Sequence, residues 1–291
     1  MEILLFQLLW KNFSTCIIPY GISMEVNSRY TRKMGNNQWA ERYIKSRSRL
    51  CITTFEINRL QNELRALVRL IPAQSLVLDV GCGKGWITAL LGSRFGSWKM
   101  IGVDISPLLI QFAAKKYPSS IFIVGDATRL PFKSESFDAV IFVAVLHHIP
   151  NVGAALKEAV RVLRPNGILF IHEPNKYSYQ ILFLGAKAPL KRVWGESMDP
   201  NERPLDPKIC VKFLRKLGLQ THYEGVNIIP FRLLSILPAK IASILDNIDR
   251  RIMHVFGSFS IGPGNFRIIA HKVERGNLAT GSICQKCLQK A

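Results

Sequence analysis

The sequence is short of acidic residues and contains no long uninterrupted apolar run. Its 291 residues include 20 Asp and Glu against 39 Lys and Arg, a formal net charge of +19. A membrane-spanning helix needs about 20 consecutive apolar residues, but the apolar segment 1–22 is interrupted by Lys11 and Pro19. The same segment lacks the leading positive charge and the small-residue cleavage site of a secretory signal. It fits either a short interfacial helix or a non-native extension ahead of a start at Met24 or Met34.

A disulfide framework is also missing. The six cysteines are scattered along the chain: Cys16, Cys51, Cys82, Cys210, Cys284 and Cys287. We therefore expect reduced thiols and a cytoplasmic protein. The C-x-x-C pair at the end of this series has no second pair of ligands, so we predict no metal site.

The excess of positive charge bears on partners rather than on fold. It favours contact with nucleic acid, anionic lipid or an acidic substrate, or it is a basic background without a specific partner. Hydrophobic residues make up 48% of the sequence and aromatic residues 10%. This composition is ample for a sizeable core and argues against global disorder.

Strand-like and helix-like segments alternate from residue 75 to residue 173. The predicted strands are rich in Val and Ile: "SLVLDV", "KMIGVDI", "SIFIVGD", "FDAVIFVAV" and "GILFIHE". Such strands, separated by helices, indicate a parallel sheet covered on both faces. Right-handed crossovers then give a doubly wound α/β fold, in which ligands bind outside the carboxyl ends of the strands.

We divide the chain into three parts. Residues 1–54 form a basic, partly helical N-terminal extension, residues 55–275 the main domain, and residues 276–291 a flexible tail. Within the main domain, residues 72–174 form the cofactor half and residues 175–265 the substrate or lid half.

The alternation weakens in the second half of the main domain. One more helix is expected between an N-cap at Asp206 and a C-cap at Gly218. An apolar insertion, residues 226–263, precedes the last strand and contains a helix at 239–256 with one apolar face. That face suits a lid, a membrane surface, or packing on the sheet.

A glycine-rich turn follows the first predicted strand. Gly81, Gly83 and Gly85 form G-x-G-x-G, whereas the dinucleotide fingerprint places its third glycine at the position of Trp86. Asp79, ahead of the turn, would repel a pyrophosphate but would attract an ammonium group. Since the N–H groups of the turn can hold a carboxylate, the combination points to an amino acid as ligand.

Two further acids follow the next two predicted strands. Asp104 ends the second strand, where a carboxylate can accept hydrogen bonds from both ribose hydroxyls. Asp126 ends the third strand, in position to accept from an exocyclic amine such as that of adenine. An amino acid, a ribose and an adenine together make S-adenosylmethionine.

Five sequence blocks resemble the class I S-adenosylmethionine-dependent methyltransferases, and in particular the branch that includes the ubiquinone and menaquinone biosynthesis methyltransferases. The blocks are "VLDVGCGKG", "IGVDIS", "GDATRLPF", "SFDAVIFVAVLHHIP" and "RVLRPNGILFIHEPN". The resemblance is strong over residues 60–173 and covers residues 206–273 in outline. It implies a seven-stranded, mostly parallel sheet with an antiparallel last strand, "NFRIIAHKV", and S-adenosyl-L-methionine as cofactor.

The resemblance also implies roles for individual residues. Gly81, Gly83 and Gly85 approach the methionine moiety, Asp104 and Ile105 bind the ribose, Asp126 and Ala127 flank the adenine, and the backbone near Val143 meets the ammonium group. For Asp79, a helix-capping or turn-fixing role is the alternative to contact with the ammonium.

The reaction implied is an in-line displacement at the sulfonium methyl. Positioning supplies most of the acceleration, and a general base is needed only for acceptors that arrive protonated. The candidates for such a base are His148 and Glu173, with a cofactor-shell role for His148 and a turn-fixing role for Glu173 as alternatives. Tyr177 and Tyr179 are candidates to line the acceptor site.

We predict a methyltransferase that acts on a small-molecule or lipid-like acceptor, with peripheral membrane contact as an option. A nucleic-acid methyltransferase is the first alternative, suggested by the charge of +19. However, "FVAVLHH" lacks the acid or amide followed by Pro-Pro and an aromatic residue that amino-methylating enzymes of that kind carry. A protein that binds S-adenosylmethionine without turnover is the second alternative.

Overall fold

The structure is a computed structural model that describes residues 71–94, 98–178, 203–227, 237–256 and 263–273, two short strands near the N-terminus and a few single positions. The predicted tail 276–291, Tyr179 and most of the predicted extension lie outside the described residues. Strands β1 (Thr15–Ile18) and β2 (Ile22–Glu25) pair as an antiparallel hairpin. The interfacial helix considered for residues 1–22 is therefore wrong at residues 15–18 and at Ile22.

Seven strands form one mixed sheet in the order β5-β4-β3-β6-β7-β9-β8. Their bounds are β3 (Leu76–Val80), β4 (Lys99–Asp104), β5 (Ile121–Val124), β6 (Phe137–Val143), β7 (Leu163–Pro174), β8 (Leu219–Asn227) and β9 (Asn265–Lys272). Strands β3 to β7 pair in parallel, whereas β9 lies antiparallel between β7 and β8. Both the doubly wound sheet and its antiparallel last strand are thus confirmed.

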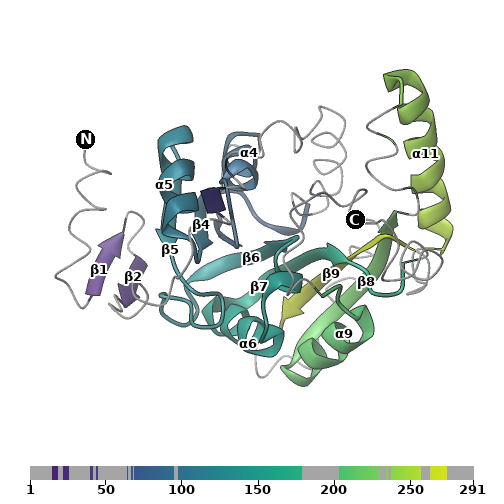
Figure 1. The fold of residues 1–291 in the computed structure, drawn as a ribbon. Coiled ribbons are helices and arrows are strands. Elements are labelled where there is room, and N and C mark those ends of the chain that lie inside the picture. Colours follow the sequence, from purple (N-terminus) through teal and green to yellow (C-terminus); the bar gives the residue numbers. More distant parts are fainter. Residues whose placement is uncertain are drawn as a thin grey trace.

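Helices cover both faces of this sheet, as Figure 1 shows. The helices are α4 (Trp86–Arg94), α5 (Pro107–Lys116), α6 (Val152–Val162), α9 (Pro207–Lys216) and α11 (Ala239–Phe256), with a short 3-10 helix, η4 (Leu146–His148). Three of the helices begin at side-chain caps, since Ser106 accepts from Leu109 N, Asn151 from Ala154 N and Asp206 from Lys208 N. The N-cap predicted for α9 is therefore confirmed.

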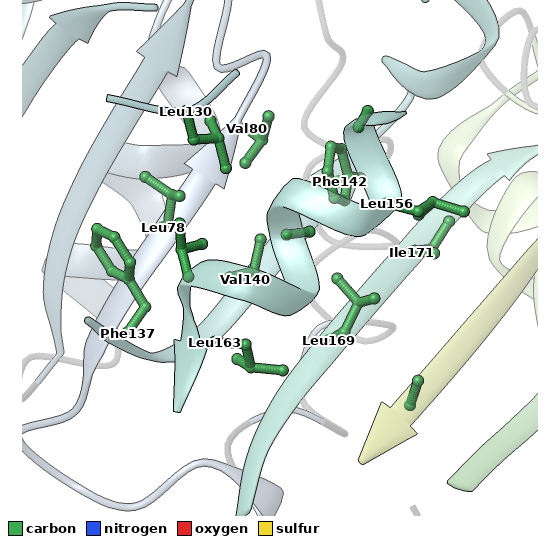
Figure 2. Close-up of a cluster of buried hydrophobic side chains, with 14 of the residues drawn as sticks. Leu78, Val80, Leu130, Phe137, Val140, Phe142, Leu156, Leu163, Leu169 and Ile171 are labelled. Atoms are coloured by element: carbon green, nitrogen blue, oxygen red, sulfur yellow. The ribbon is translucent and has the colours of Figure 1, made fainter. Parts of the chain in front are cut away.

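The central strands β3 and β6 are largely apolar because alternate side chains enter two different cores. On one face, Leu78, Val140 and Leu169 pack with residues of α6 and α9 (Figure 2). On the other face, Val77 and Ile141 belong to a cluster that includes side chains of α4. Burial on both faces favours apolar side chains along a strand, so polar side chains are found mainly near the strand ends.

Candidate active site

The glycine turn follows β3 and lies against the carboxyl end of β4. Gly81, Gly83 and Gly85 have φ angles of 74°, 54° and 76°, a region that glycine enters at little steric cost. The N–H groups of Gly81 and Cys82 both donate to Val103 O, at 2.7 and 3.0 Å. The turn is therefore held against the neighbouring strand by backbone hydrogen bonds.

Asp104 connects this turn to the start of α5. Its Oδ2 accepts from Gly83 N and its Oδ1 from Ser106 N, each at 2.9 Å. Burial is the main reason that the pKa of this carboxyl is raised, and the two N–H donors oppose the rise. Each carboxylate oxygen keeps a second lone pair, so Asp104 can still accept hydrogen bonds from two hydroxyls of a ligand. Ile105, next to it, is 54% exposed, which gives this strand end an apolar surface beside the carboxylate.

Asp126 lies two residues beyond the end of β5, next to Asp104. The residue before Asp126 contacts Asp104 directly, because Gly125 N donates to Asp104 O at 2.9 Å. Asp126 Oδ1 accepts from both the backbone N and the Oγ1 of Thr128, at 2.8 and 2.7 Å. This carboxylate therefore fixes its own turn, and Ala127 beside it packs against the core. The structure brings together the two acids that the sequence predicted for the nucleoside.

Asp79 is more deeply buried than Asp104 and Asp126. It is buried on β3, and its Oδ2 accepts a 2.6 Å hydrogen bond from Thr88 Oγ1 in the first turn of α4. Burial raises the pKa of Asp79 to about 7, although the Thr88 hydrogen bond acts in the opposite direction. This contact anchors the start of α4 to β3, which supports a structural role for Asp79 of the kind considered as the alternative. Contact with a ligand ammonium stays a prediction.

The raised pKa of Asp79 predicts a specific pH dependence of stability. The pKa of about 7 means that the folded protein holds this proton up to about pH 7, whereas the unfolded chain loses it near the ordinary aspartate pKa of 3.8. The free energy of unfolding should therefore fall as pH rises between these values, by at most about 1.4 kcal/mol per pH unit, and stay level above pH 7. Asp79→Asn keeps an oxygen for Thr88 and should remove this component. Urea unfolding of both proteins between pH 5 and pH 8 checks this; a constant difference in stability between them would contradict the assignment.

Glu173 is fully buried at the end of β7 and binds the loop after β6. Its Oε1 accepts from Val145 N and Leu146 N at 2.8 and 2.7 Å. Its Oε2 lies 2.6 Å from Nδ1 of the buried His147. The carboxylate of Glu173 therefore fixes the β6–η4 loop, which supports the turn-fixing alternative over direct contact with substrate.

His148 is more accessible than His147. It is partly buried, and its ring lies on that of His147 with a centroid distance of 4.0 Å. His147 therefore connects Glu173 to His148, because it contacts the carboxylate of Glu173 through Nδ1 and the ring of His148 through its own ring. The sequence suggested the two candidates separately, but it gave no sign that His147 connects them.

The β6–η4 loop also meets the glycine turn. Val143 ends β6, and Ala144 after it has a φ of 54°, a left-handed conformation that is unusual for a residue with a side chain. A Cβ on Gly81 would lie only 2.0 Å from Val145 Cγ2. The methionine-binding residues predicted on two different strands, the glycines and Val143, therefore lie on loops that touch.

Tyr177 lies beside the start of α9, and its role in lining the acceptor site stays a prediction. Its hydroxyl donates to Asp206 Oδ2 at 2.6 Å, and this hydrogen bond is the main reason that the pKa of the phenol is raised. The hydroxyl of Tyr177 therefore supports the N-cap of α9. Among the residues that the structure describes, no group of three or more metal-ligating side chains comes together.

Proteins described as methyltransferases resemble this chain, and the family match lies within one domain of it. Residues 78–171 match a family described as a methyltransferase domain. The chain is 38% identical over 112 residues to the tRNA (carboxymethyluridine(34)-5-O)-methyltransferase of Arabidopsis thaliana, covering 38% of this chain and 26% of that protein. It is 36% identical over 109 residues to the 2-methyl-6-phytyl-1,4-hydroquinone methyltransferase of a Synechocystis strain, covering 36% of this chain and 34% of that protein.

A third relative matches over a longer stretch. The trans-aconitate 2-methyltransferase of Methylobacterium radiotolerans is 33% identical over 174 residues, covering 59% of this chain and 64% of that protein. The chain thus spans less than two thirds of the length of each of these three relatives. Among solved structures, a methyltransferase of Thermotoga maritima described as a possible histamine N-methyltransferase superposes with a TM-score of 0.57 at 22% identity, covering 81% of this chain and 100% of that one.

The seven-stranded sheet, with its strand order and antiparallel β9, is the Rossmann-like fold of methyltransferases. Within it, residues 78–171 form a class I S-adenosylmethionine-dependent methyltransferase domain, as the five sequence blocks indicated. S-adenosyl-L-methionine is the cofactor of this class.

Proposed function

We propose that this protein transfers the methyl group of S-adenosylmethionine to a small-molecule or lipid-like acceptor. One observation carries the proposal: Asp104 ties the glycine turn to the carboxyl end of β4 while keeping lone pairs for two hydroxyls. We assign this activity to a domain that extends over residues 55–275, with the cofactor half at 72–174.

The residues present fit the cofactor. Asp104 and Ile105 would hold the ribose, and Asp126 with Ala127 would flank the adenine. The N–H groups of the glycine turn and the backbone at Val143 would face the methionine part. Bound there, the sulfonium supplies an activated methyl group, so the protein's own task is to orient the acceptor and to exclude water.

A general base is needed only where the acceptor carries a proton. We propose His148 for that role, because it is more accessible than His147, whose ring it contacts. Glu173 and His147 then act as positioning residues, since their contacts hold the β6–η4 loop. If His148 is the base, His148→Asn should lower kcat by about 100-fold or more, with S-adenosylmethionine affinity unchanged.

The relatives of this domain differ in their acceptors. The relatives described above are named for acceptors as different as a tRNA, a phytyl hydroquinone and trans-aconitate, so the shared domain does not identify the acceptor. The hydroquinone and aconitate relatives support a small or lipid-like acceptor. The charge of +19 and the tRNA relative favour RNA as a second candidate.

A labelling experiment separates these candidates. The purified full chain, with S-adenosylmethionine labelled in the methyl group, is incubated with a solvent extract of lipids, with soluble metabolites or with total RNA. We expect label in the lipid or metabolite fraction. Label in RNA alone would refute the acceptor class, and S-adenosylmethionine binding without label in any fraction would favour a binding protein.

A further inference from the structure

Helix α11 is packed with its acidic side inward. Along Ala239–Phe256 the buried positions are Ala242, Asp246, Asp249 and Met253, and both carboxylates are almost fully buried, at 4% and 0% exposure. The four isoleucines of the helix face outward instead: Ile241 is 48%, Ile244 59%, Ile248 46% and Ile252 38% exposed. A helix on a soluble domain normally presents these faces the other way round.

Asp249 and Met253 hold this orientation. Asp249 Oδ1 accepts from Ile229 N at 3.3 Å, whereas Asp246 Oδ2 pairs within the helix with Arg250 at 3.1 Å. Met253 lies against β8, where its Cε would be 3.0 Å from a Cβ on Gly225. The outward position of the isoleucines is therefore fixed by specific contacts on the opposite side of the helix.

The charges on the exposed part of the helix have one sign. Among the described side chains of α11, the exposed charged residues are Lys240, Arg250 and Arg251, and both acids face the protein. At 100° per residue, Lys240 and Arg251 lie on one flank of the isoleucine row. An apolar row with basic residues beside it is the composition of helices that lie in the surface of an anionic bilayer.

We propose that α11 docks this protein onto an anionic lipid bilayer, with Ile241, Ile244, Ile248 and Ile252 inserted between the lipid headgroups. The helix lies in the membrane surface and does not cross it, since no helix among the described residues is long and apolar enough to span a bilayer. In Figure 1, α11 stands at the β8 end of the sheet. Strand β8 ends at Asn227, on the carboxyl edge that carries the candidate site.

Docking therefore places the candidate site near the bilayer surface. Gly264 N donates to Asn227 O, and Asn175 N donates to Gly264 O at 3.0 Å, so the segment beside α11 is connected to the end of β7. A lipid-like acceptor would reach the site from the membrane; this consequence rests on the proposed function, whereas the docking itself does not.

Vesicle sedimentation with the full chain tests the docking. We expect binding to phosphatidylcholine vesicles that contain phosphatidylglycerol, and about tenfold or more weaker binding to vesicles of phosphatidylcholine alone. The double variant Ile244→Ser/Ile248→Ser should lose at least about tenfold in affinity for the anionic vesicles. The matched control is Ile209→Ser, on α9, which removes a 65% exposed isoleucine from another helix and should bind as the parent does.

The charge contribution is tested separately. Lys240→Gln/Arg251→Gln should weaken binding by about tenfold or more, whereas Lys208→Gln/Lys212→Gln on α9 should change it little. Equal binding by the isoleucine variant and its control would overturn the proposal, and so would a dimer in sedimentation analysis that the isoleucine variant abolishes. S-adenosylmethionine binding by all four variants should be unchanged, so a failure of docking is distinguishable from a failure of the proposed function.

Discussion

Replacing Asp104 with alanine is expected to raise the Kd for S-adenosylmethionine by about 100-fold or more. A hydrogen bond to a charged group contributes about 1.5–3 kcal/mol, and Asp104 is placed to accept two of them from the ribose. Isothermal titration of the variant measures the loss, and circular dichroism shows whether the fold is kept. Glu135→Gln, which alters an exposed acid before β6, is the matched control and should bind the cofactor normally.

Asp104 also accepts from Gly83 N and Ser106 N, so the variant could weaken binding merely by loosening the turn. A cofactor analogue without the ribose hydroxyls separates the two effects in a double-mutant cycle. If Asp104 binds the ribose, the parent should discriminate strongly against the analogue and Asp104→Ala should not. Equal discrimination by both proteins would show that Asp104 acts through the turn alone.

The fold was predictable because its strands carry an unambiguous signal. In β3 and β6 nearly every side chain is buried, on one face or the other, so the sequence shows nearly continuous apolar runs rich in Val and Ile, as expected of a covered parallel sheet. The N-terminal hairpin carries no comparable signal. Four-residue strands such as Thr15–Ile18 are too short to show a period, and an apolar segment of that length fits a helix equally well.

The site was predictable where a residue acts at a strand end, and less so where its role depends on distant partners. Asp104 follows its strand directly, and its position alone indicates a ligand at the carboxyl edge. Glu173 follows its strand in the same way, yet its contacts are with residues 26 to 28 positions earlier. Nothing local to Glu173 reveals these partners, since they are set by the pairing of β6 with β7.

Helix α11 illustrates a different limit. The sequence shows its apolar face, but burial is normally inferred from apolarity, and here Asp246 and Asp249 occupy the buried side. One of these buried acids, Asp249, accepts a hydrogen bond from the backbone N–H of Ile229. Which face of an amphipathic helix is covered therefore depends on the groups it meets, and the periodicity of the helix does not determine it.

Replacing Gly81 with alanine is expected to lower the free energy of unfolding by about 2–4 kcal/mol. The left-handed backbone at φ 74° costs an alanine about 1 kcal/mol. The rest comes from overpacking, about 1–3 kcal/mol, because the new Cβ would lie 2.0 Å from Val145 Cγ2. Urea unfolding measures the sum, and the matched control is Gly218→Ala, where φ is +86° and no atom lies within 4 Å of an added Cβ.

The two contributions separate in a double variant. Val145→Ala removes the methyl groups that the new Cβ would meet, so Gly81→Ala should cost only about 1 kcal/mol in that background, as Gly218→Ala does in the parent. If Gly81→Ala costs the same with and without Val145, the glycine turn and the β6–η4 loop are not in contact. The cofactor residues proposed on β3 and β6 depend on that contact. Gly81→Ala should therefore also weaken S-adenosylmethionine binding, and adding Val145→Ala should restore part of the binding.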